Sequence, residues 1–242
     1  AYQYEPNEPA VVSRLGSFLC YAGLTKQALP YVKAAVEQDP LDGRHSLHLN
    51  AVLLNLGAID SALEVAKKTS MLGFPSIFLG YTLALKGDHD SAVAQYGQSR
   101  LLMNSIMAMP TGAKPMTEQQ LEDYWDVASK GVCSGKEEDR LRYCAVLDMM
   151  HATLPDKVDH AIVIPAIWLG YPEMLFKTIG EKITSSNMPS LMYVWGDNTR
   201  TNAIKQHPEF LSFCRRIGLV KAWEKYAWPD AFTEPQNASK CI

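Results

Sequence analysis

Apolar and small residues recur at helical spacing through the first hundred residues of the chain. The first stripe, at offsets of three, four and seven residues, consists of Val12, Leu15, Gly16 and Leu19. This spacing places all four residues on one face of an α-helix, and a second stripe with Ala28 and Val32 follows after a turn. The hydrophobic pattern therefore predicts a pair of helices between residues 9 and 42.

A glycine in a turn, followed by an alanine on a helix, occurs three times in this region. The turn glycines are Gly23, Gly57 and Gly87, and the alanines follow five residues later as Ala28, Ala62 and Ala92. The alanines are 34 and then 30 residues apart, which predicts three helix pairs with a shortened helix or a tightened link near residues 70–75. We assign the pairs to residues 9–42, 43–72 and 73–106.

Small residues are expected where the two helices of a pair cross, because a larger side chain would push the helix axes apart. Gly16 and Gly80 hold this place in the first and third copies, whereas Asn50 holds it in the second. The turn glycines can adopt the left-handed conformation that ends a helix. The candidate N-caps of the helices that follow are Thr25, Asp60, and Asp88 or Asp90.

On this pattern, residues 9–104 resemble the tetratricopeptide-repeat family, whose period is 34 residues. The resemblance implies an all-α solenoid, a right-handed superhelix whose concave face is lined by the first helix of each pair. The side chains expected on that face are Ser13, Ser17, Tyr21, Arg44, Leu47, Ala51, Asn55, Ile77, Tyr81 and Leu85. Such a mixed groove suits an extended peptide or an amphipathic helix of a partner protein. The alternative occupant is the chain's own C-terminal helices.

The second half, residues 111–242, is expected to be an irregular helical region with a degenerate repeat, packed on the first part. After a loop at residues 110–115, Thr117 and Gln120 form a capping box that opens a helix, and Gly131 is expected to end it. Further helices are expected from Ser134 to His151, across residues 155–169 and across residues 172–183.

Aromatic residues mark the C-terminal tail. One helical face is formed by Phe210, Phe213 and Ile217. Trp223 and Trp228 are expected to seal the last hydrophobic layer. Residues 199–232 are similar to the tail of C-terminal sensing domains in bacterial signalling proteins, among them winged-helix CadC-like transcriptional regulators and repeat-linked nucleotide cyclases. The resemblance implies a sensory or regulatory module, although Ala231 and Phe232 stand where many relatives carry a cysteine.

Composition narrows the class of protein further. The 242 residues are 47% hydrophobic with a formal net charge of -3, which is typical of a soluble globular protein. The acid excess argues against direct binding of nucleic acid, which needs clustered Lys and Arg. No apolar run reaches the length of a membrane span, and no signal peptide is visible. Because the first residue is not Met, a processed chain or one piece of a longer protein is expected, in the cytoplasm or the periplasm.

Cysteines are odd in number and form no CxxC pair. They are Cys20, Cys133, Cys144, Cys214 and Cys241. Buried or free thiols are favoured over a disulfide framework, and Cys133 with Cys144 is the first pair to check in an oxidising compartment.

Candidate catalytic and metal-binding groups are sparse. His45 and His48 are three residues apart but have no third ligand. Cys144 and His151 lie two helical turns apart, about 10 Å, which is too far for a nucleophile pair. We therefore expect no catalytic residue, no cofactor and no metal, and a non-enzymatic module that binds a protein or another ligand. The alternatives are a structural scaffold, with a possible homodimer through the aromatic tail, and an enzyme whose site lies in the second half.

Overall fold

The computed structural model describes residues 8–100, 117–153, 159–180, 183–185 and 187–232, and within them all regular secondary structure is helical. This agrees with the all-α class predicted from the hydrophobic pattern. The predicted loop at residues 110–115 and Cys241 lie outside the described residues. None of the described helices is long and apolar enough to cross a bilayer.

The first three helix pairs lie where the repeat pattern predicts them. They are α1 (Pro9–Tyr21) with α2 (Thr25–Gln38), α3 (Gly43–Asn55) with α4 (Ile59–Met71), and α5 (Ile77–Lys86) with α6 (His89–Gln98). Helix α5 has 10 residues, whereas α1 and α3 have 13 each. The shorter spacing between the second and third copies therefore reflects a shortened helix.

The first and third pairs cross at the predicted glycines. A Cβ added to Gly16 would lie 2.6 Å from Cγ1 of Val32, and one added to Gly80 would lie 2.9 Å from the carbonyl oxygen of Ala92. In the second pair, Asn50 lies at the crossing and its Nδ2 donates a hydrogen bond to the carbonyl of Ala62 at 2.9 Å. In the second pair the two helices are therefore joined by a side-chain hydrogen bond at this position, whereas glycine in the other two pairs lets the helices pack closely.

The crossing at Gly80 gives a testable prediction about stability. Alanine in a helix is normally better than glycine by about 0.5–1 kcal/mol, but Gly80→Ala should lower the free energy of unfolding by about 1–3 kcal/mol because its Cβ has no room. Gly97→Ala, in α6 where nothing lies within 4 Å of the added Cβ, is the matched control. Urea denaturation should show opposite signs for the two variants, and equal effects would contradict the close crossing.

The turns follow the glycine prediction closely and the N-cap prediction only in part. Gly23, Gly57 and Gly87 have φ of +81°, +72° and +90°, as predicted. Asp88 caps α6 by accepting a hydrogen bond from the amide of Ser91. The prediction was wrong for Thr25 and Asp60, since α2 begins at Thr25 itself and Asp60 lies in the first turn of α4.

Two further helix pairs follow in the second half, α8 (Glu118–Cys133) with α9 (Glu137–Thr153) and α10 (Asp159–Leu169) with α11 (Pro172–Ile179). The capping box of Thr117 and Gln120 is present at the start of α8. The prediction that Gly131 ends this helix was wrong. Its added Cβ would lie 2.5 Å from Cβ of Tyr143, so Gly131 lies inside α8 at a close crossing with α9, in the same manner as Gly16 and Gly80.

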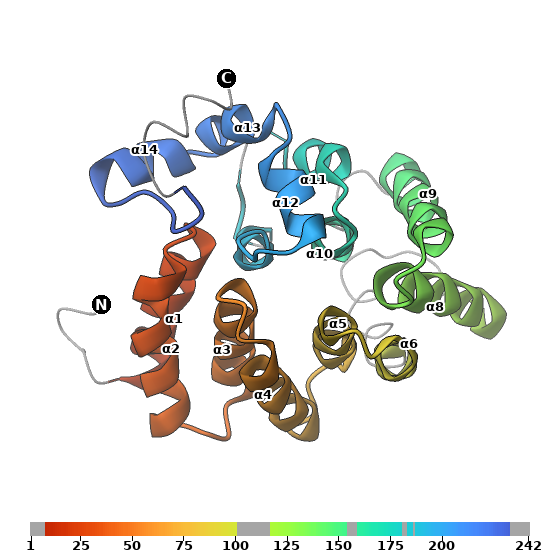
Figure 1. The fold of residues 1–242 in the computed structure, drawn as a ribbon, viewed down its shortest axis with the longest axis horizontal. Helices are drawn as coiled ribbons and strands as arrows, with labels where there is room; N and C mark the ends of the chain where they lie inside the picture. Colours follow the sequence, from red (N-terminus) through yellow and green to blue (C-terminus); the bar gives the residue numbers. More distant parts are fainter. Residues whose placement is uncertain (1–7, 101–116, 154–158, 181–182, 186, 233–242) are drawn as a thin grey trace.

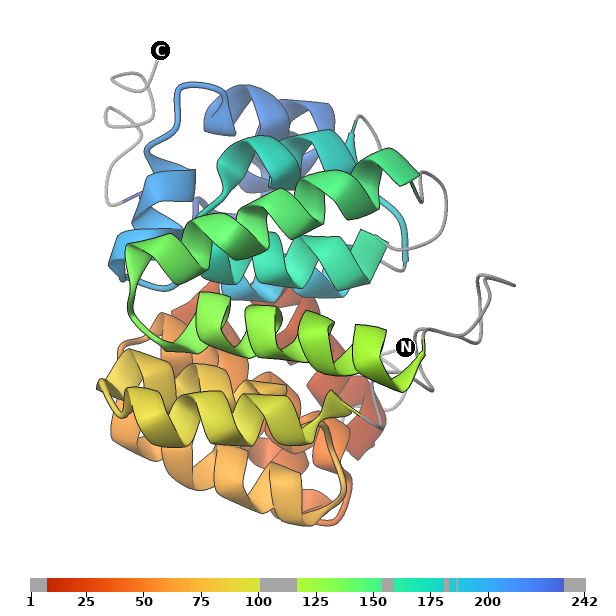
Figure 2. The ribbon, with the colours of Figure 1, turned by 90° about the vertical axis from the view of Figure 1, so that its right-hand side faces the viewer.

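The chain then closes into what we call the helical circuit. The last elements are the 3₁₀ helix η1 (Met188–Tyr193), α12 (Thr199–Lys205), α13 (Phe210–Arg216) and α14 (Leu219–Lys225). The pairs follow one another around the molecule until α14 returns beside α1 (Figure 1). On the outer wall, α6, α8 and α9 lie side by side (Figure 2). Helix η1 contacts α1, α3 and α10, so it fills the inside of the circuit.

Candidate functional site at the closure of the helical circuit

Two of the side chains predicted on the concave face, those of Tyr81 and Asn55, contact the second half of the chain. The ring of Tyr81 stacks on Trp168 of α10, with ring centroids 4.4 Å apart. Nδ2 of Asn55 donates to the carbonyl of Met192 in η1 at 2.6 Å. Of the two occupants considered for this face, the chain's own helices therefore contact Tyr81 and Asn55.

The other predicted groove residues are divided between the interior and the surface. Buried ones are Ser13, Ser17, Tyr21, Ala51 and Ile77; Leu47 and Leu85 are half-buried and Arg44 is exposed. The hydroxyl oxygens of Ser17 and Ser13 lie 2.7 and 3.0 Å from Nδ1 of His48. Burial lowers the pKa of His48 from 6.5 to about 4. This cluster joins α1 to α3 inside the protein. A ligand groove along α1 would instead need these side chains to be exposed.

Two tryptophans hold the C-terminal part against the first helix pair. The indole N–H of Trp195 donates to the carbonyl of Tyr21 at 3.1 Å, and that of Trp223 donates to the carbonyl of Ala22 at 2.8 Å. Both acceptors belong to the last turn of α1, where helix carbonyls lack partners within the helix. The second half thus supplies hydrogen-bond donors to the carbonyl groups at the C-terminal end of α1, through contacts between residues more than 170 positions apart in the sequence.

Asp230 completes this closure by capping α2 from the other end of the chain. Its Oδ2 accepts a hydrogen bond from the backbone amide of Lys26 at 2.7 Å, and its own amide donates to the carbonyl of Gly23 at 3.1 Å. The residue at the local N-cap position of α2 is Leu24, which makes no side-chain cap. A carboxylate near a helix N-terminus is also favoured by the helix dipole.

Asp230→Ala should lower the free energy of unfolding by about 1 kcal/mol, the usual cost of losing an N-cap. Asp230→Asn keeps an oxygen acceptor and should retain most of that stability. Chemical denaturation measures the difference, and amide exchange at Lys26 reports the hydrogen bond itself. Unchanged exchange at Lys26 in the alanine variant would show that Asp230 does not cap α2.

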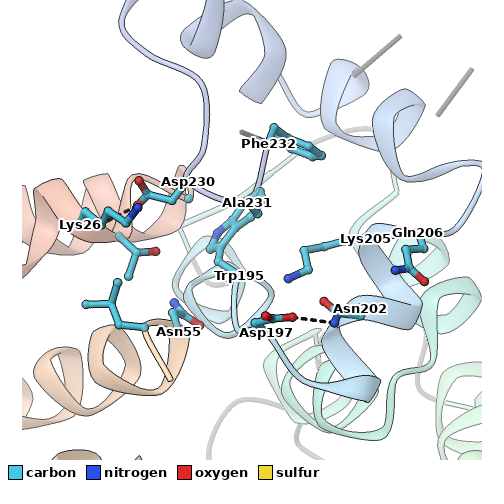
Figure 3. A pocket seen from close by; sticks show the side chains of 13 residues that line it. Lys26, Asn55, Trp195, Asp197, Asn202, Lys205, Gln206, Asp230, Ala231 and Phe232 are labelled. Atoms are coloured by element: carbon cyan, nitrogen blue, oxygen red, sulfur yellow. Dashed lines mark hydrogen bonds between the residues drawn. The ribbon is translucent and has the colours of Figure 1, made fainter. Parts of the chain in front are cut away.

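A cavity of about 520 Å³ lies at this closure, and we call it the seam pocket (Figure 3). Its walls come from the turn between α1 and α2, the turn between α3 and α4, the region of α12, and the tail. Among the side chains that line it are those of Lys26, Asn55, Trp195, Asp197, Asn202, Lys205, Gln206, Asp230 and Phe232. The pocket exists only while the two ends of the chain are together.

Charges of both signs line the seam pocket. Lys205 is half-buried, and desolvation lowers the pKa of its ammonium group. Its Nζ donates one hydrogen bond to the carbonyl of Gly196, and an ammonium carries three donors. Asp197 is exposed and accepts from Nδ2 of Asn202 at 2.8 Å. The pocket therefore offers a cationic donor at Lys205 and an anionic acceptor at Asp197, and the side-chain amides of Asn202 and Gln206 also line it.

Within the described residues, one cluster has the composition of a metal site, formed by Asp39, Asp42 and His45. Asp42 already pairs with the guanidinium of Arg44, whose hydrogen bonds hold the pKa of the Asp42 carboxyl at about 2. Asp42 is also the side-chain cap of α3. Capping of α3 and pairing with Arg44 therefore account for Asp42 without a metal ion, and the cluster lies outside the seam pocket.

The four cysteines in the described part of the chain are free and buried, as predicted: Cys20, Cys133, Cys144 and Cys214. Cys133 and Cys144 therefore form no disulfide with one another. Burial raises the pKa of both Cys20 and Cys133 to about 12. Their thiols stay protonated near neutral pH and are poor nucleophiles.

Comparisons of this chain with protein-family models, with curated proteins and with solved structures give no match.

Of the predicted groove residues, Asn55 alone lines the seam pocket. Sequence reasoning does not identify Trp195, Asp197 and Lys205. A local signal nearby is the capping box of Asn198 and Thr201 that opens α12, but it marks a helix start and carries no sign of a pocket.

Proposed function

We propose that this chain is a non-enzymatic, tetratricopeptide-like helical-repeat module that forms the sensory or regulatory part of a bacterial transcriptional regulator or signalling protein. The repeated helix pairs and their glycine crossings support the repeat assignment. The observation that carries the proposal of a sensor is the seam pocket, whose walls come from both ends of the chain. A ligand there contacts both ends, so its binding free energy favours the closed circuit over an opened one.

The lining of the seam pocket favours a small zwitterion, with a free amino acid or a very short peptide as the ligand class. Lys205 supplies an ammonium for a carboxylate, and Asp197 supplies a carboxylate for an ammonium. Trp195 and Phe232 provide apolar surface for a side chain. The volume of about 520 Å³ falls in the range of small-molecule sites.

The test is titration calorimetry with free L-amino acids, each compared with its N-acetyl and its carboxamide derivative. Loss of either charge from the ligand removes one charged hydrogen bond, so each derivative should bind about ten- to a hundredfold more weakly. Lys205→Met and Asp197→Asn should produce the same losses in the protein. Lys221→Met, on the exposed face of α14 outside the pocket, is the control and should bind normally.

Absence of binding by every free amino acid would contradict the ligand class, and equal binding by the blocked derivatives would contradict the charge pairing. The scaffold alternative needs a different result, a defined oligomer that is lost when Trp223 or Trp228 is changed. The ring of Trp223 is 1% exposed and bonds within its own chain, so an oligomer through this residue requires the circuit to open. Light scattering of the unmodified chain separates the two functions.

A further inference from the structure

A second cavity, of about 180 Å³, lies between α5, α6, α8, α9 and α10, and we call it the aromatic cavity. It shares no lining residue with the seam pocket. The rings that line it belong to Phe78, Tyr96, Tyr124, Trp125, Tyr143 and Trp168. The proposed amino-acid sensing makes no use of this space.

The walls of the aromatic cavity are held in place by packing around them. Trp168 is fully buried; it stacks on Tyr81 at an interplanar angle of 13° and meets Phe78 edge to face with centroids 5.8 Å apart. On another wall, the hydroxyl oxygens of Tyr124 and Tyr143 are 3.0 Å apart and hydrogen-bonded. Rings with neighbours on several sides cannot easily collapse into a void, so the cavity is a built feature of the core.

Two hydrogen-bonding groups of α10 at this cavity lack their usual partners. Nε1 of Trp168 is buried and has no hydrogen-bond partner among the described residues. Buried indole N–H groups are normally paired. Pro165 has no N–H, so the carbonyl of Ala161 cannot receive the helical hydrogen bond from residue 165. Ala161, Pro165 and Trp168 all line the cavity, so the unpaired donor and the acceptor without its helical donor both belong to residues of its wall.

We propose that the aromatic cavity binds a single-ring aromatic molecule with one hydroxyl group, that is, a small phenol. An apolar cavity of about 150 Å³ is large enough to take benzene, so 180 Å³ accommodates one substituted ring. Aromatic side chains favour a ring as occupant through stacked and edge-to-face contacts. The phenol oxygen accepts from Nε1 of Trp168, and its hydroxyl proton is available to the carbonyl of Ala161.

Phenol and toluene are the probes, because they have nearly the same shape and differ in the hydroxyl group. Binding is followed by the indole N–H resonances of the ¹⁵N-labelled protein. Phenol should shift the resonance of Trp168, while those of Trp195 and Trp223, which are already bonded to α1 carbonyls, stay in place. We expect phenol to bind about tenfold more tightly than toluene, the effect of one good hydrogen bond.

Two variants test the assignment. Trp168→Phe keeps a ring but removes the N–H, so the preference for phenol should fall about tenfold while toluene still binds. Ala161→Leu fills the space and should abolish binding of both probes, and it serves if the first variant folds poorly. Shifts confined to Trp195 or Trp223, equal affinity for both probes, or no binding by either one would overturn the proposal. Retained phenol binding in Ala161→Leu would overturn it as well.

Discussion

Replacing Trp223 with alanine is expected to lower the free energy of unfolding by roughly 3–5 kcal/mol, the range for truncating a large buried aromatic residue. The ring of Trp223 is 1% exposed and packs on Trp195, Trp228 and Phe232. Its N–H also holds the carbonyl of Ala22. The variant therefore loses core packing in the tail together with one link to the first helix pair.

Urea denaturation measures the loss for Trp223→Ala, and Tyr226→Ala is the matched control in the same segment. Tyr226 is 72% exposed, so its truncation should change stability by no more than about 0.5 kcal/mol. Amide exchange at Lys26 provides a second reading, because that amide is bonded to Asp230 of the tail. Faster exchange at Lys26 in Trp223→Ala is expected if the tail leaves α2, whereas a purely local defect in α14 would leave it unchanged.

The second half closes the circuit by supplying donors to the carbonyl ends of helices. Arg200 of α12, for example, donates to the carbonyl of Val132 at 2.7 Å and to that of Trp168 at 2.8 Å, near the ends of α8 and α10. Trp195 and Trp223 do the same for α1. Because four carbonyls at each helix end lack internal partners, a single C-terminal segment can bind several helices through the same chemistry.

Features that depend on neighbours in sequence could be predicted. The helix pairs follow from spacings of three and four residues, and Gly23 and the capping box of Thr117 and Gln120 act within their own turns. Tight crossings were predicted at Gly16 and Gly80 because the repeat placed them there. Gly131 lies outside the three repeated pairs, so its sequence context indicates a helix end, although it has the same role as these two.

Contacts between distant segments could not be predicted. The cap of α2 comes from Asp230, 204 residues beyond the amide that it binds. A local cap at Thr25 was the natural expectation, since caps usually come from the adjoining residue. The repeat pattern likewise predicts that Tyr81 lies on the concave face, but nothing near Tyr81 in the sequence indicates that Trp168 covers it. The seam pocket depends on such long-range closure, so its residues have no local signature.

Acidification from about pH 7 to about pH 4 should lower the free energy of unfolding by roughly 3 kcal/mol through His48 alone. The pKa of this imidazole is about 4 in the folded chain, against 6.5 for the free group; burial is the largest cause, the nearby charges of His45 and Arg14 act in the same direction, and Asp42 opposes them. Between these two values the unfolded chain binds a proton that the folded chain does not. Stability is therefore greatest above the unfolded pKa and is lost as the pH falls towards the folded one.

His48→Asn tests this, because its amide keeps a polar atom near the position of Nδ1 for Ser13 and Ser17 but does not titrate in this range. Urea denaturation at about pH 7 and about pH 4.5 should show a smaller drop in stability for the variant than for the unmodified chain, by about 2–3 kcal/mol. His151→Asn, in α9, controls for the loss of an imidazole elsewhere and should leave the drop in place. An equal drop in His48→Asn would mean that the acid sensitivity arises from other groups, and that the cluster joining α1 to α3 accepts the proton without cost.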